Sequence, residues 1–94
     1  MDDLEYIKKT IVPILKRYNI KKAEVFGSYA SGNYTSDSDL DLLIMPHENM
    51  SLLDFSRLKI ELEETLNLKV DLVSYNYINP HLRQSILSTR EVVI

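Results

Sequence analysis

Two aspartates separated by a single residue, Asp39 and Asp41, carry the strongest chemical signal in the sequence. They open the mainly apolar run from Asp39 to Met45, which predicts a strand. Side chains at positions i and i+2 of a strand project from the same face, so we expect the two carboxylates to lie close together. Their mutual repulsion calls for a positive counter-charge. A divalent cation that prefers oxygen ligands, Mg²⁺ or alternatively Mn²⁺, would supply it.

Asp71 is a third carboxylate in similar surroundings. It interrupts the apolar run Val70–Val73, where an unpaired charge is costly or shifts its pKa. Taken alone, it could be a strand-edge charge or a partner of Lys69. If its strand neighbours that of the first two aspartates, three carboxylates converge. Such a group can hold two metal ions about 3.5–4 Å apart, as in phosphoryl and nucleotidyl transfer.

Both glycines of the chain, Gly27 and Gly32, fall within one short window. This concentration indicates a close approach of the backbone to another group. Gly27 and Ser28 follow a predicted strand, and backbone N–H groups at such a turn can bind a phosphate together with the serine hydroxyl. The window lacks the Gly-Lys-Ser/Thr of a Walker A loop and the third glycine of a dinucleotide-binding fingerprint. Alone, the Gly-Ser pair is a weak signal.

The spacing of these motifs makes them specific. Gly27-Ser28, ten further residues and then Asp39-x-Asp41 resemble the signature of the DNA polymerase β-like nucleotidyltransferase superfamily. The stretch from Phe26 to Ile44 is similar to the minimal nucleotidyltransferase branch of that superfamily. This branch includes the MntA-type antitoxins, which are protein adenylyltransferases that work beside a HEPN-domain toxin. The resemblance extends over essentially the whole chain.

The resemblance implies a role for each of these residues. Asp39 and Asp41 would bind two Mg²⁺ ions together with the triphosphate of ATP. Asp71 would bind the second ion and help to deprotonate the attacking hydroxyl group. Gly27 and Ser28 would hold the β- and γ-phosphates. Three catalytic metal ligands and a two-residue nucleotide contact are thus expected.

The implied activity is the transfer of AMP from ATP to a protein hydroxyl group. The family suggests a tyrosine of a cognate HEPN toxin, which would make the chain the antitoxin of a toxin–antitoxin pair. Two alternatives stay open: a non-catalytic antitoxin that neutralises its partner by occlusion, and nucleotidyl transfer to a small molecule or an RNA. The family often has an arginine where Ser31 stands. Loss of that cation is expected to weaken a phosphate contact or a structural pair.

The other segments must position these residues. Helical spacing predicts a first helix that stops near Asn19, with Pro13 as a kink or a second start. Ser51 is the expected N-cap of a second long helix. The full set is that first helix, strand 23–26, strand 39–45, helix 52–67, strand 69–74, a short helix from residue 79 to about 88, and a last strand 91–94. This order predicts an α+β fold, a polymerase β-like core with a mixed sheet and flanking helices.

Composition sets the outer limits. The chain has 94 residues, 11 basic and 14 acidic side chains and a net charge of −3, which argues against a general nucleic-acid binder. It has no cysteine, so disulfides and thiolate metal sites are excluded. No apolar run is long enough to span a membrane and no signal peptide is recognisable, so we expect a cytoplasmic protein. We expect one domain, residues 1–94, whose small core favours a homodimer or a complex with a partner.

Overall fold

The sheet of the protein has four strands in the order β3-β2-β1-β4. The structure is a computed structural model that describes residues 3–78, 80–81 and 89–94. β2 runs antiparallel to β1 and parallel to β3, and β4 runs antiparallel to β1. The strands are β1 (Ala23–Phe26), β2 (Leu40–Ile44), β3 (Val70–Ser74) and β4 (Arg90–Val92). The expected α+β fold with a mixed sheet is confirmed.

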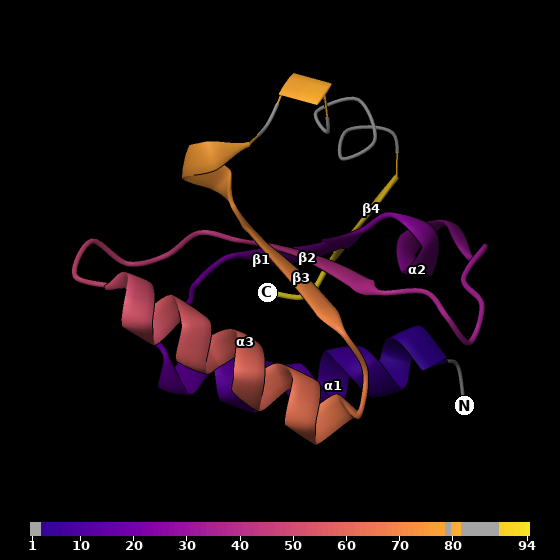
Figure 1. Cartoon of the computed structure of the whole chain (residues 1–94), viewed down its shortest axis with the longest axis horizontal. Helices are drawn as coiled ribbons and strands as arrows, with labels where there is room; N and C mark the ends of the chain where they lie inside the picture. Colours follow the sequence, from indigo (N-terminus) through magenta and orange to yellow (C-terminus); the bar gives the residue numbers. More distant parts are fainter. Residues whose placement is uncertain (1–2, 79, 82–88) are drawn as a thin grey trace.

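Two long helices, α1 (Asp3–Arg17) and α3 (Leu52–Leu66), cover one face of this sheet (Figure 1). Their apolar stripes meet the alternate residues of the central strands, and together they form the main core. The fully buried members of that core are Ile11, Leu15, Ile20, Ala23, Val25, Leu40, Leu42, Ile44, Leu58 and Leu62. The helices therefore occupy the face of β2 to which Leu40, Leu42 and Ile44 project. The opposite face, which carries Asp41, has no such helix cover, and there Leu43 packs with Phe26 in a smaller cluster.

Local signals mark the ends of both helices, and those expected from the sequence, Asn19 and Ser51, are confirmed. The Ser51 hydroxyl accepts a hydrogen bond from the Asp54 N–H (3.1 Å), and the Asp54 carboxylate accepts one from the Ser51 N–H (3.2 Å). This capping box starts α3. Asn19 and Asn67 have positive φ angles of 58° and 53°, which is the left-handed conformation that ends a helix.

Pro13 does not divide the first helix. α1 is one continuous element from Asp3 to Arg17, although proline removes one helical hydrogen bond. Ile11 and Leu15, on either side of Pro13, are both fully buried. Packing of the helix on the sheet thus outweighs the local cost of the proline.

The strand ends differ from the sequence expectation by one or two residues. β2 begins at Leu40, so Asp39 lies just before the strand, and β3 begins at Val70. β4 covers residues 90–92, after which Val93 and Ile94 continue to hydrogen-bond with Ala23. The short helix expected from residue 79 to about 88 lies outside the described residues, apart from 80–81. Over the described part of the chain, no helix is both long and apolar enough to cross a membrane.

Candidate active site

Asp41 and Asp71 lie directly opposite each other on the parallel strands β2 and β3. Neighbouring strands are about 4.8 Å apart, and residues in register project from the same face. Leu40 and Leu42, on either side of Asp41, are fully buried toward the helices. The two carboxylates therefore lie side by side on the opposite face of the sheet.

Asp39 extends this acidic group toward the end of the sheet. The Leu40 N–H donates to the Lys69 carbonyl oxygen at 2.9 Å, so the pairing of the two strands continues to this point. Asp39 is exposed and contributes to the wall of a cavity of about 280 Å³. The other residues of that wall are Ser36, Asp37, Ser38, Asn67, Leu68 and Lys69. Asp39 is thus open to a ligand from the side on which β2 and β3 begin.

Gly27 packs against the carboxylate of Asp41. A Cβ atom at position 27 would collide with Oδ2 of Asp41 and lie 3.1 Å from its Cγ, and Gly27 also has a φ of 72°. Glycine is required here for two reasons: a Cβ atom has no room, and the positive φ disfavours other residues. The close backbone approach expected from the sequence is real, and in this structure the group approached is an aspartate of the acidic group.

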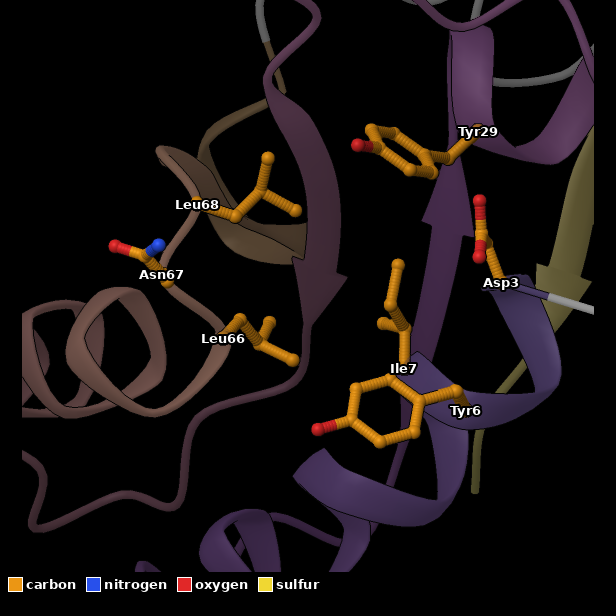
Figure 2. Close-up of a pocket in the computed structure, with 7 residues that line it drawn as sticks. All are labelled: Asp3, Tyr6, Ile7, Tyr29, Leu66, Asn67 and Leu68. Carbon is orange, nitrogen blue, oxygen red and sulfur yellow. The ribbon is translucent and has the colours of Figure 1, made fainter. Parts of the chain in front are cut away.

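Ser28 begins the short helix α2 (Ser28–Ser31) immediately after Gly27. Tyr29 fixes this turn to the core, since its side chain is only 9% exposed and stacks on Tyr34 with ring centroids 4.3 Å apart. Figure 2 shows Tyr29 beside a second cavity, of about 250 Å³, between α1 and the end of α3. None of the aspartates at positions 39, 41 and 71 lines that cavity. The Gly27–Ser28 turn is therefore anchored from the helix side and presented beside Asp41.

The electrostatics of Asp41 reflect its neighbours. Burial, followed by the negative charges of Asp71 and Asp39, raises the pKa of Asp41 from 3.8 to about 6. The ionised form is disfavoured because the carboxylate is partly removed from water and faces two like charges. A bound cation would relieve both effects.

The donor set suits a metal ion that is shared with a substrate. Within the described residues, no three His, Asp or Glu side chains are arranged to enclose an ion on their own. Mg²⁺ is usually held by one or two carboxylates and completes its shell with water and substrate phosphates. The Asp41–Asp71 pair beside the Gly27–Ser28 turn fits this mode, so we regard the residues as compatible with Mg²⁺ bound together with a phosphorylated substrate.

Comparison with known families decides what this arrangement represents. Residues 9–94 match the family described as polymerase beta, nucleotidyltransferase. The chain belongs to this nucleotidyltransferase family. The predicted enzyme class and the predicted family are confirmed. The individual metal, nucleotide and catalytic roles of Gly27, Ser28, Asp39, Asp41 and Asp71 stay predictions.

Two relatives of this nucleotidyltransferase are similar over most of their length. A protein of Methanocaldococcus jannaschii, provisionally named a protein adenylyltransferase, is 45% identical over 86 residues, which are 92% of each chain. The protein adenylyltransferase MntA of Thermococcus cleftensis is 40% identical over 78 residues, 83% of this chain and 77% of the relative.

A solved structure shares the fold at lower identity. It is that of a tri-AMPylated Shewanella oneidensis HEPN toxin in complex with an MNT antitoxin. The match has a TM-score of 0.75 and 18% identity, and covers 97% of this chain and 71% of the other. At that identity the likeness supports the fold.

Sequence reasoning missed one charged pair on the same face of the sheet. Glu24, on β1, is 8% exposed, and its Oε2 accepts a hydrogen bond from Arg90 Nη1 at 3.4 Å. The signal was available, because Glu24 interrupts the apolar segment Ala23–Phe26 in the same way as Asp71 interrupts its own strand. Nothing in the sequence indicated that Arg90 is its partner, because Arg90 lies 66 residues further along the chain.

Proposed function

We propose that this nucleotidyltransferase transfers AMP from ATP, with Mg²⁺, to a hydroxyl group of a HEPN-type toxin and so acts as its antitoxin. The family and the two named adenylyltransferases support the transfer of a nucleotide to protein. The similarity in fold to a chain from an AMPylated toxin–antitoxin complex supports the class of partner. A tyrosine is the proposed acceptor residue, and a reaction that draws on ATP belongs in the cytoplasm.

The observation that carries the proposal is a pair of carboxylates, in register on adjacent strands, beside a glycine turn. Asp41 faces Asp71 across β2 and β3, and Gly27 packs against Asp41. Negative charges and an N–H-bearing turn are thereby within reach of one triphosphate. An enzyme that moves a nucleotidyl group needs this combination, because it must bind the phosphates and neutralise the charge that develops on them.

The proposed reaction assigns binding to the first residues of the site. The backbone at Gly27 and the hydroxyl of Ser28 hold the β- and γ-phosphates, which places the α-phosphate next to Asp41. Asp39 and Asp41 would hold Mg²⁺ jointly with the phosphate oxygens, and Asp71 would hold a second ion. When bound, the metal neutralises phosphate charge and makes the α-phosphorus more electrophilic.

Asp71 is the proposed proton acceptor. Its exposed carboxylate takes the proton of the acceptor hydroxyl as that oxygen attacks the α-phosphorus of ATP. The new O–P bond links AMP to the protein, and the bond from the α-phosphorus to the bridging oxygen breaks to release pyrophosphate. Asp71 is suited to this role because it stands at the edge strand of the sheet, where a protein can approach.

The test is a transfer assay with the isolated protein, a candidate HEPN toxin, Mg²⁺ and ATP labelled at the α-phosphate. We expect label on the toxin with the wild type and none with Asp39→Asn/Asp41→Asn. Asp37→Asn is the control, because it makes the same kind of change at one exposed loop position two residues from Asp39. The control should transfer label at close to the wild-type rate.

Two results would contradict the proposal. If the Asp39→Asn/Asp41→Asn protein still neutralises the toxin, occlusion alone explains the antitoxin effect. If label appears in a small molecule or an RNA and never on protein, the acceptor class is wrong.

A further inference from the structure

One row of residues crosses the whole sheet at the level of the acidic pair. Asp71 pairs with Asp41, Asp41 with Phe26, and Phe26 with Arg90. Residues in register share a face of the sheet. Arg90 therefore lies on the same face as the two carboxylates, on the other side of β1.

The Gly27–Ser28 turn stands between these opposite charges. It directly follows Phe26, the residue of the row that separates Asp41 from Arg90. α2 contacts both β2 and β4. A phosphate chain on this turn would have Asp41 on one side and Arg90 on the other, each on a strand next to β1 and about 4.8 Å from it, with Asp71 one strand beyond Asp41.

The side chain of Arg90 is held in place by one hydrogen bond and keeps other N–H donors available. Within the described residues, the Arg90 side chain makes one hydrogen bond, to Glu24 at 3.4 Å. A guanidinium has five N–H donors. The Arg90 side chain is 40% exposed and that of Glu24 is 10% exposed. A largely buried carboxylate thus anchors an arginine that still presents donors to solvent.

We propose that Arg90 binds the β- and γ-phosphates of the nucleotide from the side of the turn opposite to the aspartates, and that Glu24 positions it. A planar guanidinium suits this task, because it forms paired hydrogen bonds to phosphate oxygens and keeps its charge at all physiological pH values. This inference rests on the proposed use of ATP at the same site.

Lys69 is the other described cation near this end of the site. It lines the cavity that includes Asp39 and precedes β3. It is therefore two strands from β1 and its turn, and lies on the side where Asp71 would meet the acceptor. The position of Arg90 therefore makes it, and not Lys69, the better candidate to bind the phosphates that leave as pyrophosphate.

The experiment measures the affinity of the full chain for Mg²⁺ with AMP-PNP, and for Mg²⁺ with AMP, by calorimetry. Arg90→Gln should weaken AMP-PNP binding at least 10-fold and AMP binding less than 3-fold, because the lost contacts are to the outer phosphates. Arg90→Lys should restore part of the affinity. Glu24→Gln/Arg90→Gln keeps a neutral hydrogen-bonding pair in case the single change destabilises the fold, and should bind AMP-PNP as weakly as Arg90→Gln.

Glu91→Gln is the matched control. It removes a 3.4 Å ion pair made by the next residue of β4, but with Lys8 of α1 on the helix-covered face. It should leave AMP-PNP affinity unchanged. Normal binding by Arg90→Gln and the double variant, or a loss found only with Lys69→Gln, would overturn this inference alone. Failure of the wild type to bind AMP-PNP would overturn the proposed function as well.

Discussion

At the scale of single residues, position 27 shows how a side chain on one strand can restrict the residue type next to a neighbouring strand. Asp41 Oδ2 occupies the place where any larger residue at position 27 would carry its Cβ. The second glycine provides an internal comparison. Gly32 also has a positive φ, of 86°, but an added Cβ there would meet nothing within 4 Å.

This contrast predicts different outcomes for two alanine substitutions. Gly27→Ala should lower AMP transfer at least 100-fold, because the Asp41 carboxylate must turn away from its place beside Asp71. Gly32→Ala should cost about 1 kcal/mol of stability from its left-handed backbone and retain most of the activity. Transfer rates and thermal unfolding of the two variants check this. Equal losses of activity would mean that the backbone conformation alone matters.

The raised pKa of Asp41 predicts a pH dependence of the metal-free protein. Between about pH 4 and pH 6 the folded state retains a proton that the unfolded chain releases. The free energy of unfolding should therefore fall as the pH rises through this window, by about 1 kcal/mol once solvent screening of this half-exposed carboxyl is allowed for.

Denaturant unfolding from pH 4 to pH 7 measures this effect in the wild type and in Asp41→Asn. The variant should lack the decline. A wild-type stability that increases over the same range by more than that of the variant would contradict the assignment. Since a carboxylate binds a cation only after losing its proton, Mg²⁺-dependent activity should also drop below about pH 6.

At the scale of elements, sequence patterns located the helices and strands well because their signals are local. Ser51 with Asp54, Asn19 and Asn67 mark helix ends through hydrogen bonds or backbone conformations within a few residues. The second helix start allowed for at Pro13 was wrong, because the burial of its neighbours Ile11 and Leu15, which holds the helix together, is a tertiary effect. The pairing of Asp41 with Asp71 and the position of Arg90 depend on strand register, which no local pattern encodes.

The capping box of α3 supports a prediction at this scale. Ser51→Ala removes the hydroxyl that accepts the Asp54 N–H and should cost about 1 kcal/mol of stability. For a chain of this size that corresponds to a fall in Tm of about 4–8 °C. AMP transfer at 25 °C should be unaffected.

Ser56→Ala is the control for this change. It lies on an exposed position inside the same helix, and should shift Tm by less than about 2 °C. Calorimetric unfolding of both variants tests the prediction. Similar Tm values for Ser51→Ala and the wild type would show that α3 is set by packing alone.

At the scale of the whole molecule, ligand binding should be visible as stability. Asp41 and Asp71 come from strands separated in the chain by all of α3, so an intact pair exists only in the folded state. Mg²⁺ with AMP-PNP at 100 times the Kd should then stabilise the protein by about 2.7 kcal/mol. A chelator should abolish the gain in Tm, and so should Asp39→Asn/Asp41→Asn. An unchanged Tm under saturating conditions would argue against a nucleotide site.

The parallel pairing of β2 with β3 has a consequence for taking the protein apart. Parallel neighbours need a connection that crosses back over the sheet, and here α3 supplies it. A cut in the loop 45–51 would give one fragment with Gly27, Asp39 and Asp41 and another with Asp71. Each fragment alone would be inert, and activity would return only when the two reassemble. The loop is thus a natural point at which to divide the enzyme into a two-part reporter of molecular association.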